Sequence, residues 1–233
     1  MIILITGAGQ GLGLETVRAA VGRGHQVIAG IRNTATENEQ LRELQNAFPE
    51  MLNVIQMDVN DESVIRKAKT IFEEQFGSID AIINNAGILL ARDVPIEELD
   101  FADVEQSMMT NLYGPMKMVK HFLPLLHQST SPCIINVSSE AGSFSGAYGG
   151  DYPYALSKSG LTYFSAQLRK ALTPQGFVVY AVHPGWIRTT MGGDQAPGDP
   201  KDAAVGLIRL AEREVLPEQD SWMIDHKGEP LPI

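Results

Sequence analysis

The sequence contains little cysteine, little positive charge and no long apolar run, and each shortage excludes a class of protein. Cys133 is the only cysteine among 233 residues, so no disulfide can form within the chain and a reducing compartment is expected. Acidic residues outnumber basic residues by 28 to 18, and the net charge of -10 argues against a nucleic-acid-binding face. No apolar run reaches the roughly 18 to 20 residues of a membrane span, and no charged leader precedes the first apolar segment. We therefore expect a cytoplasmic protein that binds neither nucleic acid nor membranes.

Two kinds of chemical site are also missing from the sequence. The five histidines are scattered without the spacing of metal ligands, so no metal site is expected. The segment from Gly142 to Gly146 resembles the nucleophile turn of serine hydrolases, whose pattern is Gly-x-Ser-x-Gly. Its central residue is Phe144, however, and a serine hydrolase is therefore disfavoured.

Short apolar runs alternate with longer amphipathic stretches along the whole chain. The apolar runs predict buried strands at 2–5, 27–31, 54–57, 81–83, 134–137, 177–182 and 222–224. The amphipathic stretches predict helices at 12–22, 37–48, 62–76, 96–127 (bent at Pro115 and Pro124), 153–172 and 201–214. This alternation is typical of an α/β fold with a parallel sheet and helices on both faces, and its unbroken rhythm favours one domain, 1–233. In such a doubly wound sheet, ligands bind outside the carboxyl ends of the strands.

A glycine-rich segment directly follows the first predicted strand. The strict Gly-x-Gly-x-x-Gly spacing is not met because residue 12 is Leu, and the absence of Gly-Lys-Ser/Thr excludes a nucleoside-triphosphate loop. A glycine-rich turn at the start of a helix lets backbone N–H groups approach a pyrophosphate, although a tight turn that needs positive φ is the alternative. We predict that a dinucleotide phosphate contacts Gly7, Gly9, Gln10, Gly11, Leu12 and Gly13.

The end of the second predicted strand indicates which dinucleotide is bound. An NAD site usually carries an acid there to hold the ribose 2′-OH, whereas this strand is followed by Arg32 and Asn33. A guanidinium can bind a 2′-phosphate bidentately, so we predict NADP(H); the alternative is that Arg32 is a solvated loop charge. The residues that end the third and fourth strands complete this part of the predicted cofactor site: Asp58, Val59, Asn85, Ala86 and Gly87.

A tyrosine and a lysine lie one helical turn apart at the start of the predicted helix 153–172. Tyr154 and Lys158 share the face that Leu161, Leu168 and Leu172 continue, so both side chains are predicted to point toward the interior. A nearby ammonium favours the phenolate, and the pair can therefore exchange a proton with a substrate.

Two serines end the fifth predicted strand, at the same edge of the sheet. Ser139 precedes Tyr154 by fifteen residues, which is enough for a loop that returns to this edge. Its hydroxyl is a candidate donor to a substrate carbonyl, and Ser138 is the alternative.

These motifs occur in the order found in the classical short-chain dehydrogenases/reductases, which the chain resembles over nearly its whole length. The matching motifs are Thr6-Gly7-x-x-x-Gly11-x-Gly13, Asn84-Asn85-Ala86-Gly87, Asn111, Ser139, Tyr154-x-x-x-Lys158 and Pro184-Gly185. The resemblance implies a single Rossmann-type domain with a seven-stranded parallel sheet.

The resemblance also implies a role for each motif residue. Tyr154 would be the general acid/base, and Lys158 would lower its pKa and hold the nicotinamide ribose. Ser139 would polarise the substrate carbonyl, and Asn111 would hold a water in a proton relay. The segment after the sixth strand would complete the cofactor site through Pro184, Gly185, Ile187 and Thr189.

Segments 184–193 and 224–232 look like those of the sniffer-like and C-factor-like carbonyl reductases, a group that mostly uses NADPH. This implies hydride transfer between NADPH and a small ketone, aldehyde or alcohol, in a homodimer or homotetramer formed through the helices at 96–127 and 153–172. The substrate loop, about 186–204, is short and leaves little lid. Beside Ser139, the expected substrate wall is mostly apolar and consists of Leu89, Leu90, Phe144, Tyr148, Trp186 and Met191.

Two other functions remain open at this stage. A dinucleotide-sensing regulatory or signalling protein with little turnover would carry the same cofactor motifs, although it would not need the Ser, Tyr, Lys and Asn set. A sugar-nucleotide epimerase also uses Tyr-x-x-x-Lys, but it usually needs a second substrate domain, for which this chain has no room.

Overall fold

A computed structural model describes residues 1–34, 39–218 and 221–233 of the chain. Its strands form one sheet in the order β3-β2-β1-β4-β5-β6-β7-β8. The strands are β1 (Ile2–Thr6), β2 (Gln26–Ile31), β3 (Leu52–Gln56), β4 (Ala81–Asn84), β5 (Cys133–Val137), β6 (Val178–His183), β7 (Met223–Asp225) and β8 (Pro230–Leu231). Strands β1 to β7 pair in parallel, as the unbroken apolar runs predicted.

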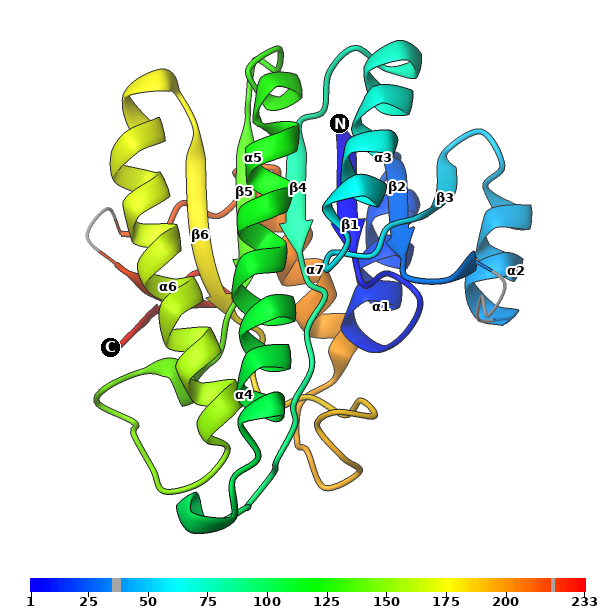
Figure 1. Cartoon of the computed structure of the whole chain (residues 1–233). Coiled ribbons are helices and arrows are strands. Elements are labelled where there is room, and N and C mark those ends of the chain that lie inside the picture. Colours follow the sequence, from blue (N-terminus) through cyan, green and yellow to red (C-terminus); the bar gives the residue numbers. More distant parts are fainter. Residues whose placement is uncertain (35–38, 219–220) are drawn as a thin grey trace.

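Helices cover both faces of this sheet (Figure 1). The helices are α1 (Gly11–Gly22), α2 (Glu39–Ala47), α3 (Glu62–Gln75), α4 (Phe101–Met108), α5 (Gly114–Leu126), α6 (Tyr152–Leu172) and α7 (Pro200–Ala211). Buried residues of α1, α2 and α7 form one core with alternate strand residues such as Ile3 and Ile5. Residues of α3, α5 and α6 form a second core with the intervening strand residues, such as Leu4. Each strand is therefore buried on both sides.

The structure corrects two features of the predicted fold. The sheet has an eighth strand, because the chain turns back at Gly228 (φ 89°) and β8 pairs antiparallel with β7. The long helical region 96–127 is divided into the short turn η2 (Ile96–Glu98), α4, the π-helical turn η3 (Met109–Tyr113) and α5. Pro115 stands in the first turn of α5, where a missing N–H costs nothing, while Pro124 lies inside the same helix. The predicted start of helix 37–48 lies outside the described residues.

The strand order changes direction between the neighbouring strands β1 and β4. At such a switch point the connections leave toward opposite faces, so a crevice opens at the carboxyl ends of the strands. The glycine-rich loop follows β1, and the Asn-Asn-Ala-Gly segment follows β4. Both predicted binding segments therefore meet where the topology creates a crevice. No helix within the described ranges combines the length and apolar character needed to cross a bilayer.

Candidate active site

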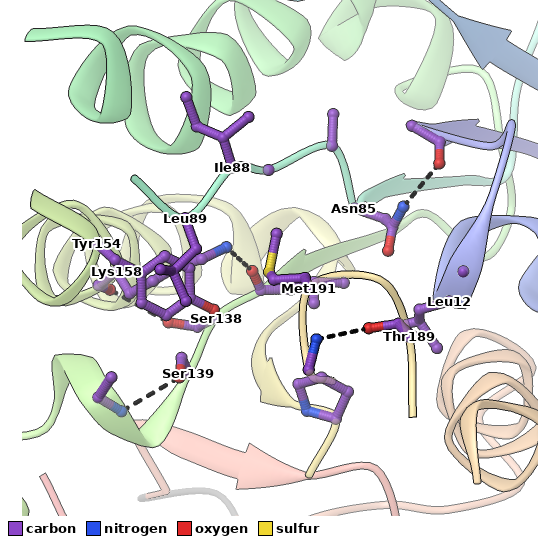
Figure 2. A pocket seen from close by; sticks show the side chains of 18 of the residues that line it. Leu12, Asn85, Ile88, Leu89, Ser138, Ser139, Tyr154, Lys158, Thr189 and Met191 are labelled. Carbon is purple, nitrogen blue, oxygen red and sulfur yellow. Dashed lines mark hydrogen bonds between the residues drawn. The ribbon is translucent and has the colours of Figure 1, made fainter. Parts of the chain in front are cut away.

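A cleft of about 1300 Å³ runs along the carboxyl edge of the sheet. In Figure 2, Tyr154, Lys158, Ser138 and Ser139 gather at one side of it, while Leu12 and Thr189 lie at the other. The cleft is lined by all nineteen predicted cofactor residues, namely Gly7, Gly9, Gln10, Gly11, Leu12, Gly13, Arg32, Asn33, Asp58, Val59, Asn85, Ala86, Gly87, Tyr154, Lys158, Pro184, Gly185, Ile187 and Thr189. Segments that lie far apart in the sequence thus form one continuous surface.

The glycine loop is packed so tightly that two of its glycines cannot be replaced without a shift. Gly7 has φ 65°, and a Cβ on it would lie 2.8 Å from Ala86 Cα. A Cβ on Gly13 would lie 2.2 Å from the carbonyl oxygen of Gly7. Hydrogen bonds join this loop to the end of β4, because the Asn85 and Ala86 N–H groups each donate to Thr6 Oγ1 over 3.1 Å. The glycines therefore serve close packing as well as the turn itself.

Helix α1 begins inside the cleft with features that suit an anion. Its N-cap residue, Gln10, makes no side-chain capping bond, and the first turn carries no acid. The first N–H groups of a helix lack partners within the helix and carry partial positive charge. The residues present therefore fit the pyrophosphate of a dinucleotide.

Arg32 lies at the same end of the cleft, directly after β2. Its side chain is exposed and makes no hydrogen bond or ion pair with any described residue. The nearest cleft acid in the sequence, Asp58, accepts a hydrogen bond from the Asn60 N–H over 2.9 Å. A guanidinium without a protein partner at this place is available to an anionic ligand.

Lys158 is buried in the floor of the cleft. Its ammonium donates to the carbonyl oxygen of Val137 over 2.7 Å and lies 5.6 Å from the centre of the Tyr154 ring. Burial lowers the pKa of Lys158 to about 8. The side chain is still mostly protonated at neutral pH, and one of its three N–H donors is committed to Val137.

Tyr154 lies one turn before Lys158 on α6 and is half-buried. Burial raises its pKa, and the hydroxyl of Ser139 acts in the opposite direction. The pKa is therefore above its ordinary value, whereas the family resemblance implied that Lys158 lowers it. Burial outweighs the favourable neighbours because the charged phenolate loses more hydration than the neutral phenol.

The hydroxyls of the two serines after β5 point to different places. Ser138 Oγ lies 2.6 Å from Thr162 Oγ1 and donates to the carbonyl oxygen of Lys158 over 3.1 Å, so this hydroxyl is used inside the fold. Ser139 Oγ accepts a bond from the Ala141 N–H over 3.2 Å at the start of η4 (Glu140–Gly142). The Ser139 hydroxyl does not donate to the backbone of the described residues, and it is the serine hydroxyl that acts on the Tyr154 phenol.

Asn111 lies outside the cleft lining, fully buried in the π-helical turn η3. Its Nδ2 donates to the Ile88 carbonyl oxygen and to Ser157 Oγ, both over 2.9 Å, and its Oδ1 accepts from the Ile88 N–H over 2.8 Å. Both amide hydrogens are therefore used within the protein. The side chain therefore fixes the segment after β4. Only the second lone pair of Oδ1 is left to bind the water that was predicted for Asn111.

Four of the six predicted apolar wall residues line the cleft. Leu89, Tyr148, Trp186 and Met191 line the cleft beside Ser139, whereas Leu90 and Phe144 do not. Leu89 and Leu90 are consecutive in a segment without regular secondary structure, and only Leu89 lines the cleft.

Phe144 is excluded from the wall by the residue that precedes it. It is 84% exposed, because the Ser143 hydroxyl turns inward and donates to the carbonyl oxygen of Pro232 over 2.8 Å. The side chain after Ser143 therefore points toward solvent.

Several cleft residues were not predicted from the sequence. Leu231 and Pro232 enter from β8 and the segment after it, which no local pattern could place beside Ser143. Arg92 follows the Asn-Asn-Ala-Gly segment, and its Nη2 donates to the carbonyl oxygen of Met191 over 2.8 Å. Its position after β4 was the available signal, since ligands bind at the carboxyl ends of strands.

A model of the short chain dehydrogenase family matches residues 1–199. The chain belongs to this family. As a short-chain dehydrogenase, it is an oxidoreductase of a class that uses NAD(P) to interconvert carbonyls and alcohols. It is 32% identical to the C-signal protein of Myxococcus xanthus over 157 residues, which cover 67% of this chain and 93% of that protein.

Solved structures are similar to this short-chain dehydrogenase along nearly its whole length. The carbonyl reductase Sniffer of D. melanogaster superposes with a TM-score of 0.91 at 27% identity, covering 99% of this chain and 98% of the other. The NADPH-bound carbonyl reductase from chicken fatty liver superposes with a TM-score of 0.87 at 26% identity, with the same coverage of 99% and 98%. These similarities confirm the fold class and the resemblance to sniffer-like and C-factor-like proteins.

Proposed function

We propose that this short-chain dehydrogenase is an NADPH-dependent reductase of small, mostly apolar ketones or aldehydes. The observation that carries the proposal is the meeting of Ser139, Tyr154 and Lys158 in the cleft that the glycine loop also lines. A dinucleotide on that loop and a substrate against the apolar wall would occupy adjoining parts of one cleft. The similarity to two carbonyl reductases supports the same assignment.

The residues of the chain supply binding and proton transfer. A nicotinamide dinucleotide supplies the hydride when it is bound. The hydroxyls of Ser139 and Tyr154 donate to the substrate oxygen and stabilise the negative charge that develops on it. Because burial raises its pKa, Tyr154 stays protonated at neutral pH and can give its proton to this oxygen. Lys158, held by the carbonyl oxygen of Val137, has further N–H donors for the cofactor and places a positive charge beside the phenol.

The preference for NADPH over NADH rests on Arg32. Its side chain has no partner among the described residues and stands where NAD sites carry an acid. Replacing it by aspartate, Arg32→Asp, removes a guanidinium partner of the 2′-phosphate and adds a repelling charge. We expect NADPH binding to weaken much more than NADH binding, as measured by titration of cofactor fluorescence. An equal loss for both cofactors would refute the assignment.

The decisive experiment compares wild type with Tyr154→Phe on a panel of small ketones and aldehydes. Phenylalanine keeps the ring and removes the proton donor, so NADPH binding should be retained while turnover falls by about 10²-fold or more. Turnover is followed as loss of NADPH absorbance, and binding by fluorescence titration. A variant with the wild-type rate would disprove the assigned role of Tyr154.

The same panel tests the competing function, a dinucleotide sensor with little turnover. The similarity to C-signal keeps this candidate in view, but a sensor has no need of a proton donor beside a serine hydroxyl in the cleft. NADPH binding without turnover of any member of the panel would favour the sensor.

We also propose that the chain forms homo-oligomers through α4, α5 and α6. The outer faces of η3, α5 and α6 enclose a groove of about 520 Å³ that is mostly apolar and is lined in part by Tyr113, Met116, Leu123, Phe164 and Leu168. Phe101 of α4 and Tyr163 of α6 are also largely exposed, at 73% and 69%. Met116→Glu should reduce the mass measured by light scattering, whereas Leu216→Glu, at an exposed site elsewhere, should not. An unchanged mass in Met116→Glu would refute this interface.

A further inference from the structure

Asp151 occupies the N-cap position of α6 but does not cap the helix. An N-cap aspartate usually has β-region backbone angles and accepts a hydrogen bond from the second or third helical N–H. Asp151 instead has φ 48° and ψ 29°, in the left-handed region, and its side chain makes no bond to the helix. A non-glycine residue in this region carries a conformational cost that the surrounding structure must offset. The carboxylate is therefore held away from its usual partners by other contacts.

Those contacts tie two loops of the cleft to the start of α6. Asp151 Oδ1 accepts the Asp93 N–H over 3.2 Å, and Asp151 Oδ2 accepts the Tyr148 hydroxyl over 2.8 Å. Asp93 and Tyr148 both line the substrate end of the cleft. Asp93 itself has φ 56°, so the strained backbone is concentrated where the loops meet. One carboxylate thus joins the segment after β4, the loop before α6 and the first turn of that helix.

We propose that Asp151 is a positioning residue for Tyr154: it fixes the first turn of α6 against the two loops that border the substrate end of the cleft, and it places a negative charge beside the phenol. The inference rests on the proposed role of Tyr154 as proton donor. Asp151 and Tyr154 both line the cleft, and the carboxylate is close enough to act electrostatically on the phenol.

Charges of opposite sign act on the phenol from the start of α6 and from the segment after β4. Burial is the main cause of the raised pKa of Tyr154, the Ser139 hydroxyl lowers it, the Asp151 carboxylate raises it and the Arg92 guanidinium lowers it. Lys158 faces the same ring from the next turn of α6. The phenol of Tyr148, which donates to Asp151, is a further titratable neighbour of Tyr154. Asp151 and Arg92 therefore act in opposite directions on the proton that the reaction uses.

The first test is the pH dependence of turnover in Asp151→Asn. Asparagine tolerates the left-handed conformation and keeps a side-chain oxygen that can accept one of the two hydrogen bonds, so the fold should be retained. Loss of the negative charge stabilises the phenolate and lowers the pKa of Tyr154. The alkaline limb of the reduction profile should therefore move to lower pH. Glu97→Gln is the matched control, because it removes the same charge from an exposed residue outside the cleft.

The second test should shift the pKa of Tyr154 in the opposite direction. Arg92→Gln removes the positive charge that favours the phenolate, so the same limb should move to higher pH. Opposite shifts in the two variants, with no shift in Glu97→Gln, would support the proposal. A fall in turnover in Asp151→Asn at every pH, without movement of the limb, would show a purely structural role and overturn it.

A third measurement keeps this inference separate from the proposed function. Ultraviolet titration of the cofactor-free protein, taken as the difference between each protein and its Tyr154→Phe counterpart, reports ionisation of this phenol without any turnover. The titration should occur at lower pH in Asp151→Asn than in Glu97→Gln. If that shift is present and no carbonyl is reduced, the proposed function fails and the role of Asp151 stands; if carbonyls are reduced and the titration is unmoved, the role of Asp151 fails alone.

Discussion

At the scale of single residues, the site separates side chains of the same chemistry by the direction in which each one points. Ser138 and Ser139 are neighbours after β5, yet one hydroxyl bonds to α6 and the other faces the cleft. Successive residues of an extended chain point to opposite sides, so a single step along the backbone changes a structural hydroxyl into a candidate donor.

Alanine substitutions at these two serines should therefore affect different properties, turnover in one case and stability in the other. Ser139→Ala removes a donor to the substrate oxygen, and turnover should fall by about 10²- to 10³-fold while thermal stability stays near that of wild type. Ser138→Ala removes the buried hydroxyl that bonds to Thr162 Oγ1 and to the carbonyl oxygen of Lys158, and should cost about 1–3 kcal/mol in unfolding free energy.

Each serine variant serves as the control for the other. Steady-state rates and denaturant titrations of both proteins provide the measurements. The assignment would be reversed if Ser138→Ala lost turnover at normal stability.

The lining of the glycine-loop end of the cleft was predictable from sequence, whereas only some of the residues at the Ser139 end were. Glycines, a strand-end arginine and the Tyr-x-x-x-Lys spacing are local signals, and the residues that carry them line the cleft. Leu231 reaches the cleft only because the chain reverses at Gly228, a tertiary event without a local pattern. The inward turn of the Ser143 hydroxyl, which excludes Phe144, likewise depends on Pro232 far along the chain.

At the scale of elements, the position of Asn111 depends on a break within the helical region 96–127. A continuous helix over 96–127 was the natural reading of the sequence, but the π-helical turn η3 interrupts it around Asn111. Such turns often occur at functional sites, because they change the direction of one side chain without ending the helix. Here the turn accompanies the placement of Asn111 against the backbone of Ile88, which fixes the segment after β4. A periodicity of hydrophobic residues does not reveal a one-residue insertion.

The contact between α3 and α5 is expected to make the stability of the protein depend on pH. Glu62, the first residue of α3, bonds to Lys120 and His121 of α5, each over 2.7 Å. Bonding to Lys120 and then to His121 lowers the pKa of Glu62 to about 2. A carboxylate with a lowered folded-state pKa contributes stability above its ordinary pKa of about 4.5, and that contribution is lost as the pH falls toward 2.

Replacement of Glu62 by glutamine removes this contribution. Glu62→Gln should therefore be slightly less stable than wild type at neutral pH, and the difference should shrink between about pH 5 and pH 2. The effect is expected to be small because the groups are exposed. Denaturant titrations at several pH values measure it, and a difference that grows on acidification would contradict the assigned ion pairs.

At the scale of the whole molecule, one sheet joins the two halves of the chain. Strands from the first half, β1 to β4, and from the second half, β5 to β8, are consecutive in a single order, and a core covers each face. The parallel α/β architecture was predictable because strands buried on both sides have unbroken apolar sequences. The cleft lies between the halves, so its formation depends on both of them.

We therefore expect residues 1–233 to unfold as one cooperative unit, whichever core is damaged. Phe122→Ala truncates a fully buried ring whose centre lies 5.9 Å from that of Phe72, in the core of α3, α5 and α6. Leu207→Ala truncates a fully buried side chain of α7 in the opposite core. The first should cost about 3–5 kcal/mol and the second about 2–5 kcal/mol, since each leaves a cavity. In both variants, circular dichroism and tryptophan fluorescence should report one coincident transition at a lower denaturant concentration. Two separate transitions, with only one of them displaced in each variant, would instead show that the faces or halves of the sheet fold independently.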